Sequence, residues 1–253
     1  MQGFLEALVI STLINALFFA LAAWRQTDKV TDLAYGVTFV TATAVLVLRH
    51  GAWAPLQLVM AAMVILWAVR LASFLFRRIL RMQIDHRFDG IRERPTAFAK
   101  FWILQALAIP IILLPALQVL TTKVPGPSPL HALGLGAWTA GLLLETLADA
   151  QKSAWKLRGE TGPITTGVWS WSRHPNYFGE TLLWWGIWLF ALPSLSGWGH
   201  SAFLGPLFIT LLLLFVTGIP PLEEASEARY GHLQAYRDYL ARTSRFFPLP
   251  PKR

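Results

Sequence analysis

Seven stretches of mostly apolar residues, each long enough to cross a bilayer, constrain this chain more than any other feature. A helix of roughly 20 apolar residues spans a hydrocarbon core about 30 Å thick. The predicted spans are residues 4–23, 33–49, 55–76, 101–121, 130–150, 176–195 and 202–219. We therefore predict an all-α membrane protein with seven transmembrane helices, organised as a single domain over residues 1–253.

The composition supports a membrane protein and narrows its chemistry. Hydrophobic residues make up 55% of the chain and charged residues 14%, whereas a soluble domain carries roughly a quarter charged residues. There is no cysteine, which excludes disulfides and Cys-ligated zinc, haem or iron–sulfur centres. The six histidines form no HExxH-like pair, so no metal site is predicted.

The distribution of Lys and Arg predicts the orientation. Nineteen of the 22 Lys and Arg residues fall in four segments, 24–32, 77–100, 151–175 and 220–253. Because cytoplasmic loops are enriched in Lys and Arg, we expect the N-terminus outside and the C-terminus in the cytosol. The net charge of +8 then follows from membrane topology, and no nucleic-acid partner is expected. In a bacterium, the protein would lie in the cytoplasmic (inner) membrane.

Four charged residues lie on one face of the helix predicted over residues 130–150 and its cytosolic extension. Glu145, Asp149, Lys152 and Lys156 follow one another at spacings of 4, 3 and 4, which is helical spacing. Acid–base pairs that merely stabilise the helix end would explain Lys152 and Lys156. Glu145 lies a full turn deeper, where a carboxylate is costly and by default marks a functional site.

The run SRHPNYFGE begins at Ser172 and leads directly into the sixth span. Ser172 is expected to cap the helix, and Pro175 suits a first turn, where a missing N–H costs nothing. The free N–H groups and the helix dipole would then favour an anion. Arg173 and His174 stand beside this predicted anion site.

The same run continues with three polar residues that enter the span. Tyr177 fits the aromatic belt at a membrane interface, just as Arg173 and His174 would suit lipid phosphates. That simpler interpretation does not explain Glu180, which lies one turn inside the bilayer on the same face as Asn176. We therefore predict a functional site here.

Further candidates lie in the other cytosolic segments. Residues 222–240 show an amphipathic pattern typical of a helix on the inner surface. Glu223 and Glu224 are unusual there, because an anionic leaflet repels acids, and a role in holding a ligand is predicted for them. In the Arg-rich segment after the third span, Arg87 belongs to an Asp-His-Arg triplet suited to phosphate or ribose.

Three candidates lie in the second and third spans. Asp32 and Tyr35 are three residues apart at the start of the second span. Asp32 is an equal candidate with Thr31 for simply capping that helix. Arg70 lies deep in the third span, where a cation needs a counter-charge.

Several of these motifs together resemble the steroid 5-alpha reductase family in its bacterial branch. They are SRHPNYFGE followed by WWG, LADAQK upstream, and EE…RYG…YRDYL…FFPLPP near the C-terminus. Sterol C14 reductases share the Arg-His-Pro-Asn-Tyr-x-Gly-acid signature. The resemblance covers residues 140–253 well, and these residues carry most of the motif for the cofactor site.

The resemblance implies a seven-helix membrane oxidoreductase that binds NADPH from the cytosolic side and reduces a carbon–carbon double bond conjugated to a ketone. A steroid-like substrate would enter from the bilayer, and a monomer is expected. The cofactor positions that carry over are Asp149, Lys156, Arg173, His174, Asn176, Tyr177 and Glu180. Our residue-based candidates for the same site are Arg87, Glu145 and Lys152. Glu223 and Glu224 occupy the region that lines the nucleotide in relatives, although the residue type differs.

The resemblance identifies the catalytic residues less directly than the cofactor residues. In mammalian members, an acid near the start of the second span and a Tyr in the third hold the steroid ketone. Asp32 or Tyr35 corresponds to the first by position, but the third span reads WAVRLASF without a Tyr. Arg70 is the nearest polar group there, and Tyr35 or Arg70 would polarise the ketone.

Two other functions compete with the reductase. Isoprenylcysteine-type membrane methyltransferases also carry Arg-His-Pro-x-Tyr and a Glu-Glu pair, but bind S-adenosylmethionine. The Asn and Glu of PNYFGE and the run DAQK favour the reductase. A non-catalytic sterol-binding or scaffold protein is the third possibility, although such a protein has no reason to bury this polar cluster.

Overall fold

The computed structural model describes residues 2–82 and 90–252, and the regular elements of this part are helices. The chain divides into two compact units. Unit 1 comprises residues 1–131 and 190–205, and unit 2 comprises residues 132–189 and 206–253. Each unit is built from segments far apart in sequence.

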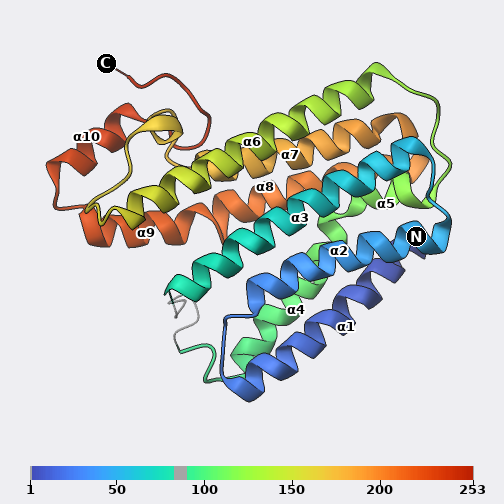
Figure 1. The fold of residues 1–253 in the computed structure, drawn as a ribbon, viewed down its shortest axis with the longest axis horizontal. Helices are drawn as coiled ribbons and strands as arrows, with labels where there is room; N and C mark the ends of the chain where they lie inside the picture. Colours follow the sequence, from blue (N-terminus) through green and yellow to red (C-terminus); the bar gives the residue numbers. More distant parts are fainter. Residues whose placement is uncertain (1, 83–89, 253) are drawn as a thin grey trace. The chain divides into compact units, whose positions relative to one another are not determined.

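Unit 1 is a bundle of antiparallel helices. Its elements are α1 (Gln2–Arg25), α2 (Thr31–His50), α3 (Pro55–Met82), α4 (Pro95–Ile112) and α5 (Leu114–Thr121), with the 3₁₀ helices η3 (Leu192–Ser194) and η4 (Gly197–Phe203). Helix α2 packs against α1 and α3, and α1 also packs against α4 (Figure 1). The close contact between α2 and α3 depends on Gly36, where a Cβ atom would collide with the side chain of Ala72.

A buried network of polar side chains joins α1 and α4, and Asn15 also reaches Thr38 of α2 at 3.5 Å. Asn15 donates from Nδ2 to the carbonyl oxygen of Ser11 at 2.8 Å, and its Oδ1 accepts a hydrogen bond from Gln105 at 2.8 Å. Ser11 Oγ donates to the carbonyl of Ala106, also at 2.8 Å. Because lipid offers no hydrogen-bond partners, such bonds between helices satisfy groups that would otherwise be costly to bury.

Two expectations for unit 1 are corrected. Neither Asp32 nor Thr31 caps α2, because the N-cap residue is Val30 and no side chain caps the helix. Thr31 Oγ1 instead donates to the carbonyl of Asp28 at 2.8 Å. The predicted span 101–121 also consists of two helices, which meet at Leu113.

The two prolines of that span explain the break. Pro110 is tolerated inside α4, whereas Pro115 lies in the first turn of α5. At that position the missing N–H of proline would be unsatisfied in any case, so the residue favours a new helix start.

Unit 2 contains most of α6 (Pro129–Leu157), α7 (Pro175–Ala191) and α8 (Leu204–Phe215), which pass the unit boundaries by a few residues. It also contains the 3₁₀ helix η2 (Gly167–Ser170), α9 (Ile219–Tyr230) and α10 (Gln234–Arg242). The amphipathic pattern over residues 222–240 was thus predicted as one segment but forms two helices. Helix α9 ends at Tyr230, with Gly231 as its C-cap, and α10 starts after Leu233.

Six helical stretches are long and apolar enough to cross a membrane within the described part of the chain. Five are Gln2–Arg25, Thr31–His50, Pro55–Arg81, Pro95–Ile112 and Pro129–Leu157, and the sixth, Gly197–Tyr230, comprises η4, α8 and α9. They match six of the seven predicted spans. The remaining one, 176–195, falls on α7, which has 17 residues. These helices fit a multi-pass integral membrane protein.

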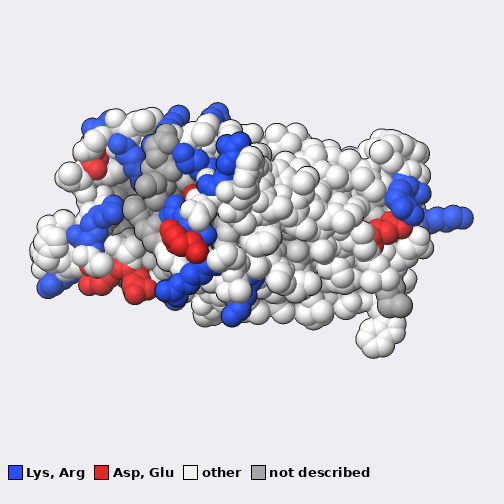
Figure 2. All heavy atoms as spheres, turned by 90° about the horizontal axis from the view of Figure 1, so that it is seen from below, with Lys and Arg blue, Asp and Glu red and all other residues white. Residues whose placement is uncertain are grey.

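The exposed surface supports this class. Along α1, large apolar side chains stand exposed at helical spacing: Leu5, Val9, Leu13, Leu17, Leu21 and Trp24. Figure 2 shows a broad area of surface without Lys, Arg, Asp or Glu, with charged side chains gathered away from it. Such an area suits contact with lipid tails.

Candidate functional site

A close contact between α6 and α7 positions the first group of predicted site residues. A Cβ atom added to Gly179 would lie 2.7 Å from both the backbone nitrogen of Glu145 and the carbonyl oxygen of Gly141. One added to Gly186, two turns further along α7, would lie 2.6 Å from the backbone nitrogen of Trp138. The two helices therefore touch backbone to backbone, as small residues permit between membrane helices.

Four polar residues lie at or next to this contact, two on each helix. Asn176 Nδ2 on α7 donates to Asp149 Oδ1 on α6 at 3.3 Å. Glu145, Asp149 and Glu180 are buried, with exposed fractions of 2, 5 and 8%. Glu145 and Asp149 stand at helical spacing on α6, as Asn176 and Glu180 do on α7, and the Asn176–Asp149 bond joins the two faces. Buried carboxylates of this kind are costly unless they bind a hydrogen-bond donor.

A second group of residues is centred on Glu223 of α9. Its Oε1 lies 3.2 Å from Nη1 of Arg173 and 3.4 Å from Nε2 of His174. Its Oε2 accepts hydrogen bonds from Nε and Nη2 of Arg245, at 3.0 and 2.8 Å. We name Arg173, His174, Glu223 and Arg245 the arginine–glutamate cluster.

The C-terminal segment holds this cluster in place. Ser172 pairs with Ser244 in a parallel bridge, and Arg173 N–H donates to the carbonyl of Ser244 at 2.8 Å. Ser172 Oγ donates to the carbonyl of Phe246 at 2.7 Å and accepts a hydrogen bond from His174 N–H at 3.1 Å. Ser172 therefore ties the C-terminal segment to the start of α7. It does not occupy the N-cap position, as was expected, because Pro175 is the first helical residue and His174 precedes it. The prediction that Pro175 lies in the first turn is confirmed.

Of the other residues predicted for the site in unit 2, two contact aromatic rings and two are exposed. Lys152 places its Nζ 4.7 Å from the centre of the Trp169 ring, a cation–π geometry. Tyr177 stacks on His174, with ring centres 6.0 Å apart. Lys156 and Glu224 are exposed. Only one acid of the Glu-Glu pair thus joins the arginine–glutamate cluster.

Burial controls the protonation state of His174. Desolvation lowers its pKa from 6.5 to about 4, although the nearby Glu223 carboxylate acts in the opposite direction. The ring is therefore neutral at pH 7. Because a carboxylate only accepts hydrogen bonds, Nε2 carries the proton that points to Glu223.

This burial predicts a pH dependence of stability. Between pH 6.5 and about 4 the unfolded chain binds a proton at this histidine and the folded chain does not. The free energy of unfolding therefore decreases as the pH is lowered through this window, and it decreases no further below pH 4. The full loss is about 3 kcal/mol. Thermal unfolding in detergent should show a steeper decline over this window for the wild type than for His174→Gln. Equal slopes would contradict a buried neutral ring.

The three predicted catalytic residues lie in unit 1. Asp32 Oδ2 is 3.5 Å from Nη2 of Arg78 on α3. Tyr35 packs edge-to-face against Trp67 of α3, with ring centres 6.3 Å apart. Arg70 places its guanidinium 5.5 Å from the ring centre of Phe74. Arg87, the remaining predicted residue, lies outside the described residues.

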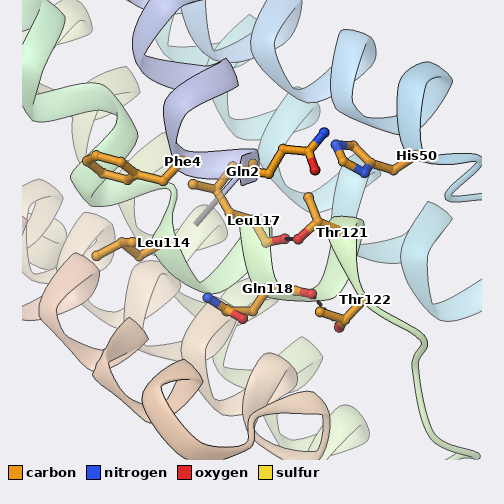
Figure 3. A pocket seen from close by; sticks show the side chains of 9 residues that line it. Gln2, Phe4, His50, Leu114, Leu117, Gln118, Thr121 and Thr122 are labelled. Carbon is orange, nitrogen blue, oxygen red and sulfur yellow. Dashed lines mark hydrogen bonds between the residues drawn. The ribbon is translucent and has the colours of Figure 1, made fainter.

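Unit 1 also contains a pocket of about 240 Å³ near the start of α1 (Figure 3). The labelled residues that line it include Gln2, His50, Gln118 and Thr121, from α1, α2 and α5. A hydrogen bond of 2.8 Å joins His50 to Glu6 beside it. None of the predicted site residues lines this pocket.

Sequence reasoning missed three parts of the site in unit 2. In the sequence, Arg245 stands out only as one of the basic residues of a cytosolic segment, and nothing marks Trp169. Tyr239, which donates from its hydroxyl to the carbonyl of Trp169 at 2.8 Å, was also missed. The SRFFPLPP tail stands out in the sequence only through the resemblance to the reductase family. Its basic and aromatic composition was the available signal, but its pairing with Trp171 and Ser172 depends on contacts distant in sequence.

Comparison with known proteins gives the family. The chain is 37% identical to the uncharacterized protein C594.04c of Schizosaccharomyces pombe over 86 residues, which are 33% of this chain and 23% of that protein. The match thus spans about a quarter of that relative. No solved structure matches the chain. The profile of DUF1295, described as a protein of unknown function, matches residues 18–243. The chain therefore belongs to DUF1295, a family of membrane proteins related to the steroid 5-alpha reductases.

Proposed function

We propose that this protein is an NADPH-dependent reductase of the bilayer that saturates the carbon–carbon double bond of a 4-ene-3-keto steroid or a similar hydrophobic enone. NADPH, when bound, supplies a hydride to one carbon of the double bond, while the other carbon takes a proton and NADP⁺ leaves. The proposal includes a seven-span topology with a cytosolic C-terminus. One observation carries it: within unit 2, the motif residues form a buried polar interface next to a cluster of cations.

The residues of unit 2 fit the chemical groups of a dinucleotide. Arg173 Nε is buried and has no hydrogen-bond acceptor among the described residues, so it is available to a phosphate oxygen. Arg245 and Lys152 add further positive charge. Arginine suits this role because its planar fork matches two phosphate oxygens at once.

The α6–α7 interface fits the neutral parts of the same ligand. The carboxylates of Glu145, Asp149 and Glu180 accept hydrogen bonds, and Asn176 both donates and accepts. Ribose hydroxyls and a carboxamide offer the matching donors and acceptors. The buried carboxylates also exclude an anionic group from this interface, which restricts the phosphates to the arginine–glutamate cluster.

The candidates in unit 1 would act on the ketone. Negative charge develops on the ketone oxygen as the double bond is reduced, and a hydrogen-bond donor or a cation stabilises it. Tyr35 offers a hydroxyl and Arg70 a guanidinium. Asp32 would act through Arg78, its ion-pair partner. We propose Tyr35 or Arg70 as the polarising group.

The test is NADPH oxidation, followed by the near-ultraviolet absorbance of NADPH, by detergent-purified protein given progesterone. Steroid-dependent oxidation with one saturated product is the expected result. Absence of both oxidation and NADPH binding would contradict the proposal. Binding of S-adenosylmethionine instead would identify an isoprenylcysteine-type methyltransferase, and NADPH binding without turnover would restrict the error to the substrate.

A further inference from the structure

The surroundings of Glu223 have the form of an oxyanion site. Donors reach its two carboxylate oxygens from two sides: Arg245 makes a two-nitrogen contact with one, and Arg173 and His174 approach the other. Proteins use paired guanidinium groups in this way to bind phosphates. Here a side chain of the protein itself fills the position.

The arginine–glutamate cluster keeps a net positive charge even with Glu223 present, so it still attracts an anion. Two guanidinium groups face one carboxylate, His174 is neutral, and Lys152 is near enough to affect the charge state of His174. The Glu223 side chain is 27% exposed and that of Arg245 is 48% exposed. The ion pair is therefore accessible from water, and its partners can exchange without opening the core of unit 2.

We propose that Glu223 occupies the place of a ligand phosphate in the arginine–glutamate cluster and that the phosphate displaces it. Glu223 then acts as a built-in competitor that lowers the affinity of the arginine pair for phosphate. The inference rests on the proposed function only where it takes the phosphate to be that of a nucleotide. An anionic lipid headgroup would offer the same phosphate group to the site. Displacement would also free α9 from Arg173 and Arg245.

The decisive variant is Glu223→Gln, measured with two probes: inorganic pyrophosphate by thermal shift, and NADPH by its fluorescence. Removing the competing carboxylate should tighten binding of both probes by about ten- to a hundredfold, the value of one or two charge-assisted hydrogen bonds. Glu227→Gln, an exposed acid on the same helix, is the matched control and should change neither affinity. Unchanged or weaker binding to folded Glu223→Gln would overturn the inference.

The two probes separate this inference from the proposed function. Tighter pyrophosphate binding without NADPH binding would support the phosphate site and reject the cofactor. The same titrations in nanodiscs of phosphatidylcholine, with and without phosphatidylglycerol, distinguish the source of the phosphate. If phosphatidylglycerol competes with pyrophosphate in Glu223→Gln, the natural phosphate is that of a lipid.

A second measurement does not depend on the variant folding. In the wild type, bound pyrophosphate should increase hydrogen–deuterium exchange in Ile219–Tyr230, because the helix loses its ion-pair partners. If Glu223 instead serves to hold the arginines around the ligand, binding should slow exchange in α9. That result would overturn the inference.

Discussion

Replacing Glu180 by Gln is expected to lower the kcat/KM of NADPH-dependent enone reduction by about 10- to 100-fold. Glu180 is 8% exposed and directly follows Gly179, the glycine of the contact between α6 and α7. A buried carboxylate that binds a ligand donor forms a charge-assisted hydrogen bond, and the amide of Gln replaces it with a weaker neutral one. Steady-state rates at varied NADPH concentrations would measure the loss.

The effect should be specific to the α6–α7 interface. Asn176→Ala, which removes the hydrogen bond to Asp149, should lower the same parameter. Glu160→Gln removes an exposed acid of unit 2 and should leave the rates unchanged. If folded Glu180→Gln protein reduces the substrate at the wild-type rate, the interface does not bind the cofactor.

A Gly179→Ala substitution should destabilise unit 2 strongly. The new Cβ atom would lie 2.7 Å from backbone atoms of both Gly141 and Glu145, and backbone cannot move aside as a flexible side chain can. Helices α6 and α7 must therefore separate, at a cost of about 2–3 kcal/mol. We expect the unfolding temperature in detergent to fall by about 5–10 °C.

Gly136→Ala provides the matched control on α6. No atom lies within 4 Å of a Cβ at that position, so the substitution should leave the unfolding temperature unchanged or raise it slightly, because Ala favours helix. Equal stability of the two variants would show that the glycines do not set the spacing of α6 and α7. NADPH binding by Gly179→Ala should weaken together with its stability.

Much of the helical architecture was predictable from residue patterns, and its exceptions have local causes. Six of the predicted spans coincide with helices able to cross a membrane. Pro115 starts α5 within one predicted span, and Gly231 ends α9 within a predicted amphipathic segment. Proline and glycine were visible in the sequence, but whether each kinks a helix or ends it depends on the packing around it.

The candidate site was also predictable in part from the sequence. Helical spacing alone placed Glu145 with Asp149, and Asn176 with Glu180, because side chains four residues apart lie on one face of a helix. Spacing did not indicate that the two faces meet. Their meeting depends on Gly141 and the other helix-contact glycines, whose role as a packing surface is not visible in the spacing of the polar residues.

The amino-acid pattern was sufficient to predict a helical membrane protein with a polar cluster around SRHPNYFGE, because hydropathy and helical periodicity act over a few neighbouring residues. Only the tertiary structure shows that Glu223, and not its neighbour Glu224, contacts Arg245. The Glu223–His174 contact joins positions 49 residues apart, and the Ser172–Phe246 bond joins positions 74 apart. Such pairings depend on the path of the whole chain, which no local pattern encodes.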